Sequence, residues 1–230
     1  MKLLLLTLLS AVLFSSCQET TKNNDSVEFI PNPEKNPELT AAQTIAYENG
    51  IAHWKDVSEI KFTFNVDRAG NHSERSWTWK PKTNDITMRN AQDTVSFNRN
   101  KLDSVSKPYD AAFINDKYWL LAPYNLVWDE GTKISEATKE AAPISGDLLN
   151  KITITYGSEG GYTPGDAYDF FYDNDFKVKE WNFRQGNAEK PSMTTTWDAY
   201  EDFNGLQIAT MHQDSTGGFK LYFTNISVKK

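Results

Sequence analysis

The sequence has a single cysteine, Cys17, among its 230 residues. An internal disulfide, a thiolate metal site and dithiol chemistry are therefore excluded. It has only three histidines, His53, His72 and His212, and they are scattered along the chain. Since a zinc site needs three or four converging ligands, we expect no metal and no cofactor.

Clustered positive charge is also missing. The chain carries 24 Lys and Arg against 31 Asp and Glu, a formal net charge of −7. Phosphate binding depends on runs or stripes of Lys and Arg, so we do not expect this acidic chain to bind nucleic acid.

The longest apolar run is too short to span a membrane. Leu3 to Phe14 holds 12 mostly apolar residues, whereas a spanning helix needs about 20. Lys2 precedes this run, and the small residues Ser15 and Ser16 follow it. The pattern is typical of a cleaved secretory signal, which we predict for residues 1–16.

Cys17 lies directly after this run, and a polar tract follows it. Leu13-Phe14-Ser15-Ser16-Cys17 resembles the lipobox that directs diacylglycerol attachment to a cysteine, in the looser form found in Bacteroidota. The resemblance implies that the mature chain starts at a lipidated Cys17, although an incidental cysteine in an ordinary signal is the alternative. Two or three acyl chains anchor a protein stably, at about 0.8 kcal/mol per buried CH₂ group.

Residues 17–37 are predicted to be the lipidated cysteine and a flexible tether, because they offer few apolar groups. Only one acidic residue, Glu19, lies near the lipidated end. Surface-export signals of Bacteroidota lipoproteins are denser acidic runs, so we expect the periplasmic face of the outer membrane and not the cell surface. Residues 38–230 contain no linker and are predicted to form one domain, a monomer.

A helix is predicted after the tether, with Asn36 as its N-cap and Gly50 closing it in a left-handed conformation. From residue 58 the apolar period changes to two, which indicates strands with one buried face. The first runs through Ile60–Val66, and the second contains Trp77 and Trp79. Further strands are predicted at Asp85–Arg89, Thr94–Asn98, Lys117–Leu121, Leu126–Asp129, Lys151–Tyr156, Ala167–Asp173, Lys177–Arg184, Met193–Tyr200, Leu206–His212 and Phe219–Val228.

The connections between these strands indicate antiparallel pairing. Asp173–Asp175 and Thr216–Gly218 are predicted to be tight hairpins. A second helix is predicted at Leu102–Ile114, and a loop at Ser135–Asn150. Strands without crossover helices between them pair antiparallel. The fold class is therefore mainly β (α+β): a curved antiparallel sheet, closed or partly closed, with one or two helices against its open side.

Motifs for catalysis are weak. Gly157–Gly161 holds a serine among glycines, but without the spacing of a nucleophile elbow. Asp166 and Asp169 flank Tyr168, and two facing carboxylates could serve a hydrolase. Such neighbours are common in a chain this acidic, so we do not expect an enzyme, and a carboxylate-based hydrolase is the minor alternative.

Aromatic residues, 13% of the chain, are the most informative feature. Two interpretations stay open: the aromatic residues fill a core between sheet and helix, or they line an apolar ligand cavity inside a small barrel. The candidate ligand-binding residues are Trp77, Trp79, Trp119, Tyr162, Trp181 and Trp197.

The segment Gly160–Asp166 has three glycines and a proline, which specify its backbone conformation. In the structural interpretation, Tyr162 packs down and Asp166 caps a turn. In the functional one, the loop lies at the mouth of the barrel, with Tyr162 beside Trp119 and Trp181 as a gate.

Several stretches together resemble a family of Bacteroidota envelope lipoproteins related in fold to the lipoprotein-localisation carriers LolA and LolB. They are Gly50–Val57, Ser76–Trp79, Phe113–Pro123, Gly160–Asp166, Trp181–Phe183 and Thr196–Trp197. The resemblance implies an unclosed antiparallel barrel whose concave side is plugged by helices. In the carriers this apolar concavity takes up acyl chains.

We therefore expect a membrane-anchored envelope lipoprotein that binds a lipid or other hydrophobic ligand in a half-barrel cavity. The alternative is a non-catalytic envelope module that binds protein or glycan and has a packed aromatic core. A roomy apolar concavity would favour the first function, and a filled one the second.

Overall fold

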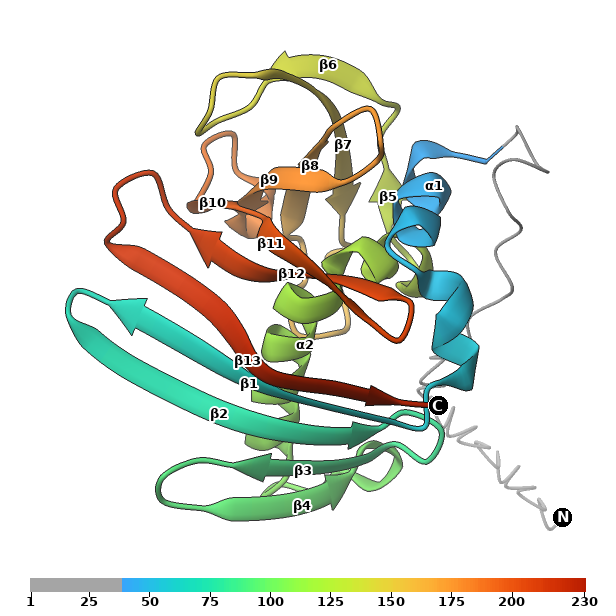
Figure 1. Ribbon diagram of the computed structural model, residues 1–230, viewed down its shortest axis with the longest axis vertical. Coiled ribbons are helices and arrows are strands. Elements are labelled where there is room, and N and C mark those ends of the chain that lie inside the picture. Colours follow the sequence, from blue (N-terminus) through green and yellow to red (C-terminus); the bar gives the residue numbers. More distant parts are fainter. Residues whose placement is uncertain (1–38) are drawn as a thin grey trace, which may run out of the picture.

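The computed structural model describes residues 39–230 (Figure 1). The predicted signal, Cys17 and the tether lie outside these residues. Within the described chain, no helix is both long and apolar enough to cross a membrane.

The fold is mainly β, and two antiparallel sheets make up most of it. The first sheet has seven strands in the order β11-β12-β13-β1-β2-β3-β4. Its strands are β1 Glu59–Arg68, β2 Asn71–Lys80, β3 Asp85–Arg89, β4 Thr94–Asn98, β11 Asp198–Phe203, β12 Leu206–Gln213 and β13 Phe219–Lys229. The predicted alternation holds at the start of β1, where Ile60 and Phe62 are buried and Lys61 is exposed, but it fails further on, where Thr63 and Asn65 are buried as well.

The second sheet has six strands in the order β10-β9-β8-β7-β5, with β6 also paired to β7. Its strands are β5 Lys133–Ile134, β6 Thr138–Ala141, β7 Leu148–Thr155, β8 Ala167–Tyr172, β9 Val178–Arg184 and β10 Met193–Thr196. The predicted loop at Ser135–Asn150 is therefore wrong, because it contains β6 and the start of β7. Glu180 holds the connection between them, since its carboxylate accepts the backbone N–H groups of Ile144 and Ser145 at 2.6 and 2.9 Å.

Trp197 alone separates β10 from β11, so the chain passes there from the second sheet into the first. Its backbone N–H donates to the Lys179 carbonyl at 2.7 Å, which keeps this turn against β9. The predicted single strand Met193–Tyr200 is thus two strands. The sheets do not close on each other, so the fold is an unclosed half-barrel, as predicted.

The long helix α2, Lys107–Trp128, lies between the two sheets (Figure 1). Predicted strands at Lys117–Leu121 and Leu126–Asp129 are wrong, and the helix predicted at Leu102–Ile114 starts later and extends further. Every residue from Asp116 to Leu126 is buried. A helix enclosed on all sides shows no polar face, so apolar periodicity does not distinguish it from a buried strand.

The short helix α1, Ala41–Glu48, begins four residues later than predicted, and the predicted N-cap, Asn36, lies outside the described residues. Thr40 is the N-cap, and it forms a capping box with Gln43. Gly50 ends the helix at φ +90°, as predicted, and leads into the 3₁₀ helix η1, Ile51–Asp56. Two single 3₁₀ turns complete the fold: η2 Arg99–Lys101 and η3 Gln185–Asn187.

A buried polar contact fixes α2 against β2. The Asp116 carboxylate accepts hydrogen bonds from Arg75 Nε and Nη2 at 3.0 and 2.7 Å and from Trp77 Nε1 at 2.8 Å. Burial raises the pKa of Asp116, and the Arg75 guanidinium opposes this effect. Asp116 therefore sets the depth at which the helix lies in the concave side.

Candidate functional site

The concave side of the half-barrel is filled by α2 and aromatic rings from both sheets. Trp77 of β2 lies 5.3 Å from the ring of Phe113 on α2. Trp119 of the same helix lies 4.5 Å from Trp181 of β9, and Trp181 lies 5.4 Å from Trp197. The helix thus joins the inner faces of the two sheets through ring contacts.

Five of the six candidate ligand-binding residues belong to this core. Trp79, Trp181 and Trp197 are at most 1% exposed, Trp77 is 2% exposed and Trp119 is 8% exposed. The indole N–H of Trp77 is bonded to Asp116. Trp119, Trp181 and Trp197 pack against one another, and Trp77 and Trp79 pack against Phe113 of α2. The ligand cavity expected inside the half-barrel is therefore not seen at these five residues.

Tyr162, the sixth candidate, lies apart from the others and is 46% exposed. Its hydroxyl donates to Asp110 Oδ2 at 2.7 Å, and Asp110 also pairs with Arg99 Nε at 2.8 Å. Partial burial and the bond to Asp110 raise the pKa of Tyr162 to about 12. Its ring makes no contact with those of Trp119 and Trp181 in the described chain, so the arrangement expected for a gate is not seen.

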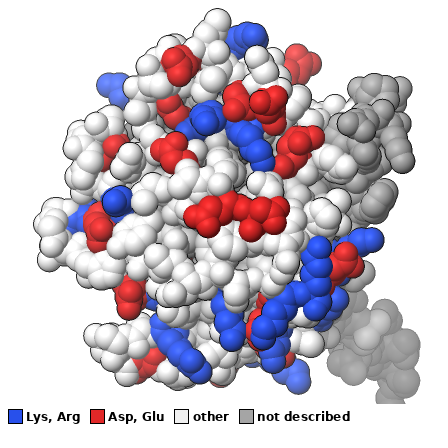
Figure 2. All heavy atoms as spheres, viewed as in Figure 1, with Lys and Arg blue, Asp and Glu red and all other residues white. Residues whose placement is uncertain are grey.

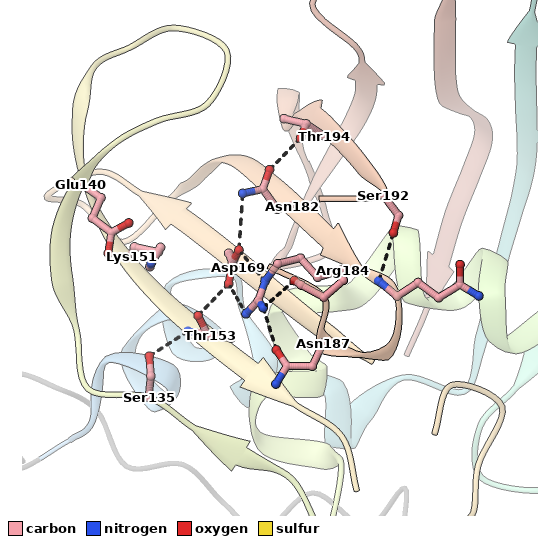
Figure 3. A network of polar contacts seen from close by, with 12 residues as sticks. Ser135, Glu140, Lys151, Thr153, Asp169, Asn182, Arg184, Asn187, Ser192 and Thr194 are labelled. Atoms are coloured by element: carbon pink, nitrogen blue, oxygen red, sulfur yellow. Dashed lines mark hydrogen bonds and ion pairs between the residues drawn. The ribbon is translucent and has the colours of Figure 1, made fainter. Parts of the chain in front are cut away.

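The two carboxylates of the hydrolase alternative have structural partners. Asp169 of β8 accepts hydrogen bonds from Arg184 Nε and Nη2 at 3.0 and 3.1 Å and from Thr153 at 2.7 Å (Figure 3). Asp166 accepts the backbone N–H of Gly186 at 2.7 Å. Both carboxylates thereby hold the end of β9 and the turn after it against β7 and β8.

An open pocket of about 620 Å³ lies between α1, the end of α2 and β5. Its lining is Thr40, Ala41, Ala42, Gln43, Leu126, Val127, Ile134, Ser135, Glu136 and Ala137. Small and aliphatic side chains make up more than half of this set. Gln43 and Glu136 supply polar groups, and Ile134 is a large apolar side chain that is 37% exposed.

The packing of α1 on α2 forms one wall of this pocket. The Tyr124 hydroxyl of α2 donates to the Asn49 carbonyl at the end of α1 at 2.6 Å. Leu126 and Ala42 are buried where the two helices meet, while Val127 is only half-buried. The facing wall, β5, pairs only Lys133 and Ile134 with β7. The site is thus bounded by two packed helices on one side and by a short edge strand on the other.

The sequence analysis named no residue of this pocket as a binding residue. Alanine, valine and isoleucine carry no signal of ligand binding by themselves, and β5 is too short to show alternation. The pocket results from a tertiary contact between two helices that the sequence places far apart.

In the described part of the chain, no three His, Cys, Asp or Glu side chains lie together as a metal site would require. A scan against protein-family models and a search of curated proteins found no match for the chain.

Two solved structures are similar to this chain in fold, each at 12% sequence identity. One is a DUF1329 family protein from Desulfovibrio piger, with a TM-score of 0.47, covering 82% of this chain and 92% of that chain. The other is a putative outer membrane lipoprotein-sorting protein domain from Vibrio parahaemolyticus, with a TM-score of 0.45, covering 86% and 94%. At these values neither neighbour indicates what this chain binds, and the half-barrel is described from its own strand pairing.

Proposed function

We propose that this chain is a membrane-anchored envelope lipoprotein that binds a small hydrophobic ligand in the pocket between α1, α2 and β5. The observation that carries the proposal is the pocket itself. Its volume of about 620 Å³ falls within the roughly 300–1,000 Å³ typical of small-molecule sites, which are mostly apolar with few polar groups.

The lining favours a ligand without a negative charge at the rim. Glu136 is exposed beside the pocket and would repel a carboxylate. Thr40, Gln43 and Ser135 offer hydrogen bonds to a neutral polar head. An acyl chain or a ring system with a neutral head fits this chemistry.

Filling the pocket tests the proposal. Ala137 is exposed on the lining, so Ala137→Trp places an indole in the pocket without altering the core. We expect this variant to bind N-phenyl-1-naphthylamine, a neutral fluorescent hydrophobe, at least tenfold more weakly than the unchanged chain. The measurement is a fluorescence titration, with thermal unfolding to check the fold.

The matched control is Ala91→Trp, which adds the same indole to the exposed turn between β3 and β4. It is expected to bind the probe with unchanged affinity. Equal affinity in both variants, or equal loss in both, would show that the probe binds elsewhere.

Membrane attachment is part of the same proposal and is expected to depend on Cys17. Metabolic labelling with a palmitate analogue should mark the unchanged protein and leave Cys17→Ser unlabelled, since no other cysteine exists in the chain. Equal labelling of both proteins would end this part of the proposal. The attachment is proposed for the outer membrane, with the domain on its periplasmic face.

The filled concave side, taken by itself, favours a second candidate, an interaction module that binds protein or glycan through its exposed loops; the first candidate is carried by the separate pocket at α1. The aromatic core around α2 is packed, and Tyr162 stands out from it on a loop rich in glycine. The probe titration separates the two candidates, because this second function predicts no saturable binding of a hydrophobe even to the unchanged chain.

A further inference from the structure

Lysines gather at one end of the outer face of the first sheet, where β1 begins and β2 ends. The register pairs Ile60 with Trp79, and both side chains are fully buried on the inner face. Because side chains alternate between the faces of a strand, the adjacent Lys61 and Lys80 point to the outer face. Both are exposed.

The end of β13 brings two further lysines, Lys229 and Lys230, to the start of β1. Lys229 pairs with Glu59 in the β1–β13 register, and its Nζ lies 2.8 Å from the Glu59 carboxylate. Lys61 Nζ lies 3.6 Å from the same carboxylate. The lysine patch, as we name it, comprises the exposed residues Lys55, Lys61, Lys80, Lys82, Lys229 and Lys230.

The patch carries surplus positive charge on an acidic chain. Among its six lysines, Lys61 and Lys229 pair with Glu59, and the charge of Lys80 acts on Asp85. Glu59 is engaged by Lys229, and Asp85 accepts hydrogen bonds from Thr83 and Asn98. Figure 2 shows several blue side chains close together at the lower right, the end where Figure 1 marks the C-terminus, with a few red ones among them; other blue and red side chains are scattered over the rest of this face.

We propose that the lysine patch binds the anionic phospholipid surface of the membrane that holds the tether, and so orients the domain on it. This inference rests on the proposed membrane attachment. A surface made of lysines alone suits a spread anionic surface, because lysines act as point charges, whereas specific phosphate recognition prefers the bidentate geometry of arginine.

The position of the patch in the fold fits this partner. The chain enters the described structure at Leu39, and α1 and η1 lead from there directly to β1, where the patch lies. Figure 1 shows α1, η1 and the C-terminus along one side of the molecule. Leu39, where the described chain begins, and the lysine patch can therefore face the same membrane.

Vesicle sedimentation with the full mature chain carrying Cys17→Ser tests the patch without the lipid anchor. We expect binding to vesicles of phosphatidylethanolamine and phosphatidylglycerol, and none to phosphatidylethanolamine and phosphatidylcholine. Replacing Lys55, Lys80 and Lys82 with Gln should weaken partitioning about a hundredfold, since each lysine near such a surface contributes roughly a factor of five. These three lysines make no ion pair with Glu59, so the contacts of Glu59 with Lys61 and Lys229 stay intact.

The control replaces Lys139, Lys179 and Lys190 with Gln, which removes the same charge from exposed sites on β6, on β9 and between η3 and β10. This variant should keep binding, and binding should vanish near 1 M salt, where the Debye length is about 3 Å. Equal loss in the control, equal binding to both vesicle types, or no binding at all would each overturn the lysine patch. None of these outcomes bears on the pocket, which is tested by Ala137→Trp.

Discussion

Replacing Gly50 with alanine is expected to destabilise the fold by about 3–5 kcal/mol. Gly50 has φ +90°, where a side chain costs roughly 1–2 kcal/mol, and an added Cβ would lie only 1.9 Å from the Gly205 carbonyl oxygen. The backbones of η1 and the β11–β12 hairpin would have to separate. Urea unfolding of the mature chain measures the loss of free energy.

Gly70→Ala is the matched control for this prediction. Gly70 has φ +80°, but an added Cβ would meet no atom within 4 Å. This variant should therefore lose only the conformational part, roughly 1–2 kcal/mol. If both variants lost the same free energy, the close approach of Gly50 to Gly205 would contribute nothing to stability.

Acidification is expected to destabilise the fold through His212, well before most carboxylates titrate. The ring is fully buried, 4.5 Å from Trp197 and 5.4 Å from Trp119. Burial lowers the pKa of His212 to about 3, whereas the unfolded chain takes up this proton near pH 6.5. The stability is therefore complete above about pH 6.5 and falls by about 1.4 kcal/mol per unit as the pH drops towards 3.

Between pH 6.5 and 4.5 the loss should reach roughly 2–3 kcal/mol, measured by urea unfolding at each pH. His212→Phe should remove this slope, because no imidazole remains to be protonated in the unfolded state. His72→Gln should retain it, since His72 is half-exposed and its pKa is raised by the bond to Asp67. A His212→Phe variant with the slope unchanged would show that other groups cause it.

The strands of the first sheet were predicted well from the sequence, because one face of the sheet is mostly buried and much of the other is exposed to solvent. The strands at Asp85–Arg89 and Thr94–Asn98 match the structure at both ends. The second half of α2 was not predicted as a helix, because burial on all sides removes the apolar periodicity. The helix accommodates Pro123 by leaving helical angles at Leu121, where φ is −130° and ψ is 25°.

The site was harder to predict than the fold. Large aromatics on inward-facing positions give the same sequence signal whether a helix fills the concave side or a ligand does. Only the path of α2 distinguishes the two, and that path depends on contacts such as Asp116 with Arg75, 41 residues apart. The pocket depends on α1 meeting the end of α2, where Tyr124 and Asn49 are 75 residues apart.

The pairing of β1 with β13 sets the order in which the domain can be completed. β1 is an inner strand of its sheet, yet one of its neighbours is the final strand, with Glu59 opposite Lys229. A chain that leaves the ribosome from its N-terminus exposes one edge of β1 until the last 11-residue strand arrives. Pairing across such a sequence separation is slow. The fold therefore stays incomplete until β13 has been synthesised.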